Sequence, residues 1–182
     1  LPARTHTIFN IVERTAQIMS LFVNSTILDG EEHVGKIDFL TTLAGYIHWQ
    51  LSGRRVLGIG DASGMLPVDS AAGDYSEEMI EKFDALVESK AYPWKLRDIL
   101  PKALKAGEDA GYLTEAGAMK LDPSGKLKAG VPMCPPEGDA GTGMVATNAV
   151  RKRTGNVSAG TSSFSMIVLE HELSRPYEVI DM

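Results

Sequence analysis

Cysteine and basic charge are both scarce in this chain, and each shortage excludes a class of protein. Cys134 is the single cysteine among 182 residues, which excludes a framework of internal disulfides. We expect Cys134 to be buried as a small apolar side chain, and its isolation fits a reducing compartment. Lysine and arginine number 18 against 24 aspartates and glutamates, a net charge of −6. Nucleic-acid binding needs a basic surface, and the short run Arg151–Arg153 is typical of a solvated helix end, so we expect no nucleic-acid partner.

Long apolar runs are absent as well. A run such as Phe164–Leu169 is far shorter than the roughly 20 residues that a membrane-spanning helix needs. Polar residues interrupt the start of the chain at Thr5, His6, Thr7 and Asn10, so nothing there is typical of a signal peptide. We therefore expect a cytoplasmic protein without a membrane partner. Hydrophobic residues make up 43% of the chain and charged residues 23%, which is ordinary for a folded globular domain.

Apolar periodicity predicts a mixture of helices and strands. The predicted helices cover residues 7–28, 37–51, 76–89 and about 140–153. The predicted strands cover residues 55–59, 129–134, 156–159 and 164–170. Pro101 argues against one continuous helix over 96–104. The glycine- and proline-rich stretch 107–130 carries a turn signal at 122–125.

An acidic residue at a glycine-flanked turn, Asp139, is the first candidate for chemistry. The segment 137–143 has the sequence EGDAGTG and precedes a predicted helix. A helix N-terminus offers unpaired N–H groups and partial positive charge. An aspartate there stays ionised and can accept a proton from a hydroxyl that it touches, while Gly141 and Gly143 leave room for a ligand. The alternative is that Asp139 only caps the helix.

A turn of small residues, Gly160-Thr161-Ser162, is the second candidate. It lies between two predicted strands that come after the Asp139 segment. Backbone N–H groups in such a turn can point at a phosphate, and the hydroxyls of Thr161 and Ser162 add donors. The alternative is an ordinary polar hairpin turn. Together the two candidates suggest phosphoryl transfer to a small alcohol.

The glycine-rich run 58–64, GIGDASG, is the third candidate. Its spacing, G-x-G-x-x-x-G, departs from the dinucleotide fingerprint, and no acidic residue follows a second strand at the expected distance. We interpret the run as a structured turn in which Asp61 or Ser63 caps the next segment of the chain. A nucleotide-dependent dehydrogenase is the weaker enzymatic alternative.

These motifs, in this order, resemble those of the FGGY carbohydrate kinases, the family of xylulokinase and glycerol kinase. The stretch FLTTLAGYI at 39–47, followed by Leu51-Ser52-Gly53, looks like the family's helix with a leucine-threonine/serine-glycine stop. Asp61–Gly64 matches the DASG turn typical of xylulokinase-like members, and Gly138-Asp139 matches the pair that carries the family's catalytic aspartate. Gly160-Thr161-Ser162 matches its phosphate-contacting turn. The pattern is most similar to xylulokinase-like members.

The resemblance implies an α/β fold of the actin-like ATPase type, built of ribonuclease H-like domains and present here in part. Residues 1–153 would be the latter part of the N-terminal domain, and residues 154–182 the first β-hairpin of the C-terminal domain. Asp139 would be the catalytic base, and with Gly138 it would contact a ketose or polyol. The turn Gly160-Thr161-Ser162 would hold phosphates of ATP, which binds with Mg²⁺. No metal ligand is expected from the protein itself.

The chain also departs from the family. The family's N-terminal phosphate hairpin, early sugar-contacting segment and C-terminal adenosine-binding motif are absent, and Ala140 stands where many xylulokinases have asparagine. We therefore interpret the chain as a segment of a longer kinase and expect the segment alone to be a poor catalyst. The sequence leaves open whether that kinase forms a homodimer. The alternative from another class is a non-catalytic binding or scaffold fragment with an actin-like half-fold.

Overall fold

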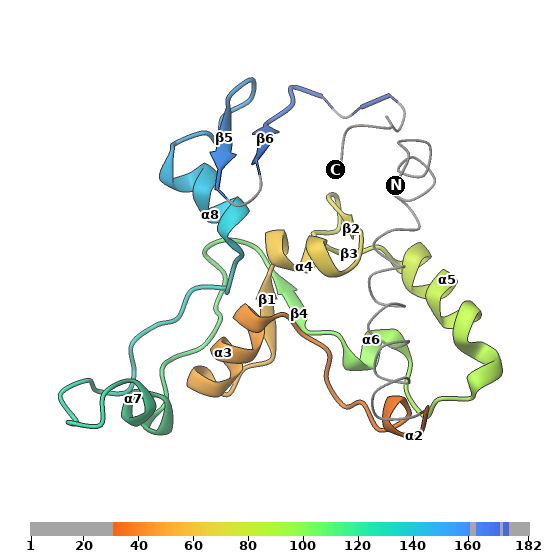
Figure 1. Ribbon diagram of the computed structural model, residues 1–182, viewed down its shortest axis with the longest axis horizontal. Helices are drawn as coiled ribbons and strands as arrows, with labels where there is room; N and C mark the ends of the chain where they lie inside the picture. Colours follow the sequence, from red (N-terminus) through yellow and green to blue (C-terminus); the bar gives the residue numbers. More distant parts are fainter. Residues whose placement is uncertain (1–30, 161–162, 172, 175–182) are drawn as a thin grey trace.

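The computed structural model describes residues 31–160, 163–171 and 173–174 (Figure 1). The helix predicted over 7–28 therefore lies outside the described residues. The described helices are α2 (Glu31–Val34), α3 (Leu43–Ser52), α4 (Ile59–Met65), α5 (Glu77–Val87), the 3-10 helix η2 (Glu88–Lys90), α6 (Leu96–Ile99), α7 (Glu115–Leu121) and α8 (Asp139–Ala146). The described strands are β1 (Val56–Gly58), β2 (Val68–Asp69), β3 (Asp74–Tyr75), β4 (Lys102–Leu104), β5 (Gly155–Ala159) and β6 (Ser163–Ile167).

A parallel pair of short strands, β1 and β4, lies at the middle of the described chain (Figure 1). Leu57 stands opposite Ala103 in this pair, and every residue of β1 is buried. Parallel strands need a crossover connection, and here the connection contains α4, the antiparallel pair β2–β3, α5 and α6. The chain passes directly from β1 into α4, so the start of α4 is held against the buried strand.

The main hydrophobic core lies around this crossover. Helix α5 buries Met79, Ile80 and Phe83, the apolar stripe that its periodicity predicts. The core's fully buried side chains include Val34, Leu57, Leu66, Phe83 and Leu96. Burying one such side chain is worth about 2 kcal/mol. The contacts therefore bind β1, α4, α5 and α6 into one unit.

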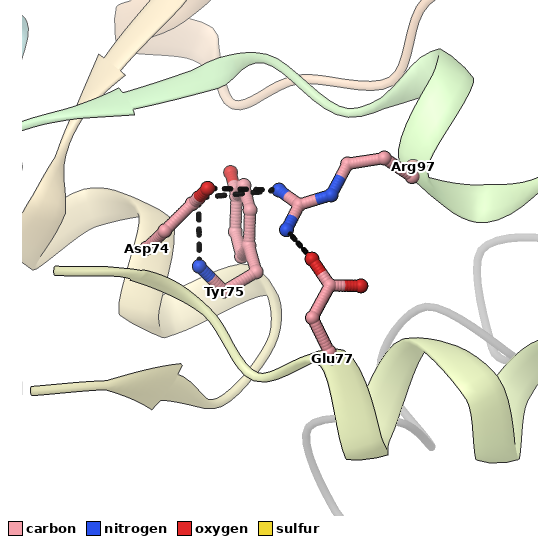
Figure 2. Close-up of polar contacts among 4 residues, drawn as sticks. All are labelled: Asp74, Tyr75, Glu77 and Arg97. Atoms are coloured by element: carbon pink, nitrogen blue, oxygen red, sulfur yellow. Dashed lines mark hydrogen bonds and ion pairs between the residues drawn. The ribbon is translucent and has the colours of Figure 1, made fainter. Parts of the chain in front are cut away.

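Arg97 joins three elements around this core through charge (Figure 2). Its Nη1 donates to both carboxylate oxygens of Asp74 in β3, at 3.2 Å each, and its Nη2 pairs with Glu77 at the start of α5. The guanidinium carbon also lies 5.7 Å from the centre of the Tyr75 ring. Such partly exposed pairs are individually weak, but one guanidinium here links α6 to β3 and α5.

The helix predicted over 37–51 is shorter than expected, because α3 begins at Leu43. Its N-cap is Thr42, whose hydroxyl accepts a hydrogen bond from the backbone N of Gly45 at 3.1 Å. That bond satisfies an N–H group that a helix start leaves unpaired. The predicted end is confirmed, since Gly53 is the C-cap with a φ of 74°, a conformation that glycine adopts readily.

Three predictions from local pattern were wrong. The motif Asp61–Gly64 is not a turn but lies within α4, where Asp61 occupies the first helical turn. The helix predicted to reach residue 153 ends at Ala146, and Asn148 then adopts a left-handed φ of 54°. Residues 129–134 form only an isolated bridge in place of a strand. Short segments carry weak periodicity, so contacts elsewhere in the fold set their boundaries.

Helix α7 was not predicted, because it is short and lies in a stretch rich in turn residues. Its N-cap hydroxyl, on Thr114, accepts from the backbone N of Gly117 at 2.9 Å and donates to the carbonyl of Leu51 at 2.9 Å. These bonds place the start of α7 against the end of α3. Cys134, which we expected to be buried, is exposed in the chain between α7 and α8.

Candidate active site

The start of α4 is where the glycine-rich run meets the acidic segment 137–139. Gly58 is the N-cap of α4 and Gly60 lies in its first turn. A Cβ atom on Gly58 would stand 2.1 Å from Oε1 of Glu137, and one on Gly60 would stand 2.6 Å from Oε2. Both distances are far inside van der Waals contact. The two glycines therefore form a socket that the Glu137 carboxylate fills.

The carboxylate of Glu137 accepts two backbone hydrogen bonds in this socket. The N–H of Gly60 donates to Oε1 at 3.2 Å and the N–H of Asp61 donates to Oε2 at 2.9 Å. Alongside, the N–H of Gly58 donates to the carbonyl of Pro136 at 2.7 Å. A carboxylate at a helix N-terminus also interacts favourably with the helix dipole. The chain's own carboxylate thus occupies the N–H groups that a bound phosphate would use, which argues against a dinucleotide at this run.

Asp61 extends the contact toward Gly138 and α3. Its Oδ2 accepts a hydrogen bond from the hydroxyl of Thr42 at 2.5 Å. Its Oδ1 lies 3.4 Å from the point where a Cβ on Gly138 would stand. The structure therefore brings together three motifs that are distant in sequence: the threonine before α3, the DASG aspartate and the Gly138-Asp139 pair.

Asp139 is the first residue of α8 and is exposed. The N-cap is Gly138, which has no side chain to cap the helix, so Asp139 is not the N-cap that the alternative interpretation proposed. Within the described residues, no hydrogen bond reaches the Asp139 carboxylate. The hydroxyl of Thr142 donates back to the carbonyls of Gly138 and Asp139, at 2.9 and 3.1 Å. The backbone at Asp139 is thus held while its carboxylate faces solvent.

The second predicted site is described only in part. Strands β5 and β6 form an antiparallel hairpin with Ala159 opposite Ser163, which confirms the predicted strand pair. Gly160, the first loop residue, is exposed and has open space where a Cβ would stand. Thr161 and Ser162 lie outside the described residues. Figure 1 shows the hairpin beside α8, and Asn156 in β5 donates to the hydroxyl of Thr147, just after α8, at 3.3 Å.

Glu137 is the residue of this region that the sequence analysis left without a role. The sequence pattern indicated a base at its neighbour Asp139, and the glycines at 58 and 60 were compared only with a nucleotide-binding motif. Glycines two residues apart at the end of a buried strand indicate a close approach by another group, which is a signal that could have pointed to Glu137. The sequence alone offers no way to choose that group among 24 acidic residues.

The described residues contain no group of three or more His, Cys, Asp or Glu side chains arranged to hold a metal ion. None of the described helices is long and apolar enough to cross a bilayer. In comparisons with known proteins, no family model and no curated protein matched the chain.

Proposed function

We propose that this chain is part of a longer carbohydrate kinase with an actin-like ATPase fold. The enzyme would transfer the γ-phosphoryl group of ATP to a hydroxyl of a small ketose or polyol. Asp139 would act as the general base, with Gly138 lining the sugar site. Gly160, Thr161 and Ser162 would contact the phosphates of the nucleotide.

The contact between the acidic segment and the start of α4 carries this proposal. A general base must be held in place while its carboxylate stays accessible to substrate. Glu137 is bound through two backbone N–H groups and Gly138 lies against Asp61. Asp139, next along the chain, is exposed. This combination of a tied backbone and an accessible carboxylate is what proton abstraction from a sugar hydroxyl requires.

The residues of this chain act on the sugar hydroxyl. Asp139 accepts the hydroxyl proton as the oxygen forms a bond to the γ-phosphorus and the bond from that phosphorus to the bridging oxygen of ADP breaks. Gly138 and Gly141 beside it carry no side chain that would stand between Asp139 and a sugar. MgATP, when bound, supplies the phosphoryl group and neutralises charge that develops during transfer. Phosphoryl transfer depends mainly on such positioning and charge stabilisation.

Turnover of sugars by the intact protein tests the proposal. We expect ATP-dependent phosphorylation of at least one sugar in a panel of pentuloses, hexuloses and polyols, measured by coupled ADP release. The Asp139→Asn variant keeps the side-chain shape but cannot accept the proton, so kcat should fall by about 10²–10⁴-fold. Nucleotide affinity should be nearly unchanged.

A matched variant controls for the general effect of removing a negative charge. Glu115 is also an exposed acidic residue in the first turn of a short helix, and Glu115→Gln should leave kcat unchanged. If Asp139→Asn retains full turnover, Asp139 is not the base. The scaffold alternative is favoured if the intact protein phosphorylates no sugar and Asp139→Asn matches the parent protein in every binding assay.

A further inference from the structure

We infer that Glu137 is a positioning residue that sets the place of Asp139, through its carboxylate in the glycine socket of α4. This inference rests on the proposed function, because it assigns a role relative to the base. Glu137 has no direct part in the chemistry, since both of its carboxylate oxygens are engaged by the backbone of α4.

The socket is built for this one side chain. Any side chain larger than hydrogen at Gly58 or Gly60 would overlap the carboxylate, with Cβ contacts of 2.1 and 2.6 Å. The carboxylate takes up the N–H groups of Gly60 and Asp61, which the start of a helix otherwise leaves unpaired. Hydrogen bonds that involve an ionised acceptor are stronger than neutral ones. The glycines and the carboxylate therefore depend on each other.

The attachment is short and has backbone restraints on both sides, so it can determine where Asp139 lies. Only Gly138 separates Glu137 from Asp139, and the carbonyl of Pro136 is bound to Gly58 at 2.7 Å. Pro136 also restricts the backbone on one side, and α8 begins at once on the other. The socket in turn stands on β1, whose residues are all buried. Glu137 thus fixes the position of Asp139 relative to the core of the fold.

The competing explanation is that Glu137 only stabilises α4 as a remote cap. The two explanations differ for Gly60→Ala, which would expel the carboxylate without removing it. Alanine has the higher helix propensity, so a pure cap role predicts only a change in stability. A positioning role predicts a fall in kcat for this variant even where the protein stays folded.

The experiment measures kcat and KM of the intact protein for a set of variants. Misplacing a catalytic group by about 1 Å can cost on the order of 10²-fold, so Glu137→Ala and Gly60→Ala should lower kcat by roughly that factor, with the KM for ATP nearly unchanged. Glu137→Gln keeps one acceptor and should lose less. Gly64→Ala is the matched control, because it lies in the same helix with nothing within 4 Å of the added Cβ. Glu108→Ala removes another carboxylate that accepts from backbone, at Lys105, and should leave kcat intact.

The outcomes separate this inference from the proposed function. If Asp139→Asn keeps turnover, the proposed function fails whatever Glu137 does. If Asp139→Asn abolishes turnover while Glu137→Ala and Gly60→Ala keep kcat within about twofold of the parent, well short of the factor expected for a misplaced base, the positioning role is overturned. If no sugar is turned over, amide hydrogen exchange decides: Glu137→Ala should speed exchange over 138–146 but not over α7. Unchanged exchange over 138–146 would overturn the inference.

Discussion

At the scale of single residues, the described core contains buried polar groups that differ in how they are satisfied. His48 in α3 is buried, and its Nε2 lies 2.9 Å from the carbonyl oxygen of Ala110. The hydroxyl of Ser52 donates to the carbonyl of His48 at 2.8 Å. The hydroxyl of Tyr75, in contrast, is buried with no hydrogen-bond partner within the described part of the chain. A buried group without a partner costs free energy.

Replacing Tyr75 with phenylalanine should therefore cost no stability. The free energy of unfolding at neutral pH should stay the same or rise by about 1 kcal/mol, since an unpaired hydroxyl loses its hydration on folding. Burial raises the pKa of the Tyr75 phenol, and the carboxylate of Asp74 raises it further. The phenol of the unfolded chain ionises near pH 10. The stability that depends on a neutral Tyr75 phenol is therefore fully present below that pH, and it is lost as the pH rises toward the folded pKa. Tyr75→Phe should flatten that alkaline loss.

Urea denaturation of the parent and the variant between neutral pH and about pH 11, which brackets the ordinary tyrosine pKa, would measure both effects. Tyr112→Phe is the control, because Tyr112 is 58% exposed. A loss of more than about 1 kcal/mol at neutral pH in Tyr75→Phe would mean that the hydroxyl makes a hydrogen bond after all.

At the scale of elements, contacts between helices depend on residues that allow close approach. Helix α7 meets the end of α3 at Gly117, where a Cβ would stand 2.3 Å from the backbone carbonyl oxygen of Leu51. Thr114 bonds to that same carbonyl through both its N–H and its hydroxyl, at 3.0 and 2.9 Å. The stretch around α7 is thereby attached to α3, although nothing in its own composition requires a helix.

Gly117→Ala should destabilise the protein by about 1–3 kcal/mol, because the added methyl group forces α7 away from a rigid backbone carbonyl. Gly64→Ala in α4 is the opposite case, since its Cβ would meet nothing within 4 Å. That variant should be neutral or stabilising by about 0.5–1 kcal/mol from helix propensity. Thermal unfolding of both variants tests the contrast, and equal stability of the two would show that α7 can move away from α3 at little cost.

At the scale of the whole molecule, the β5–β6 hairpin stands apart from the main core in its burial. Val157 and Ile167 are 70% and 65% exposed, and none of the described residues of either strand is buried. An isolated two-stranded hairpin is marginally stable in water. This distribution agrees with a division of the chain after residue 153, which we keep as a proposal.

Amide hydrogen exchange should distinguish the hairpin from the core. In the 182-residue chain we expect opening free energies in β5 and β6 at least about 2 kcal/mol below those in β1 and β4, because few buried contacts hold the hairpin. In the intact protein the hairpin should become protected, if further strands cover it as the proposed second domain requires. Equal protection of β5 and β1 in the chain alone would contradict this picture.

Local sequence was sufficient for the parts of the fold whose signals are local. The apolar stripe of α5, the glycine stop at Gly53 and the hairpin around Gly160 were all predicted, because each depends on neighbouring residues in the chain. Asp139 was singled out in the same way, from an acidic residue among glycines before a helix.

Only the tertiary structure decided what the glycine-rich run 58–64 is for. The sequence shows the residues and spacing of this run. Its partner, Glu137, lies far along the chain, and no periodicity links the two. The same holds for Thr42 and Asp61, and for the attachment of α7 to α3. The physical reason is that helix caps and stripes are satisfied within a few residues, whereas a buried donor or a glycine socket is satisfied by whichever distant group folding brings to it.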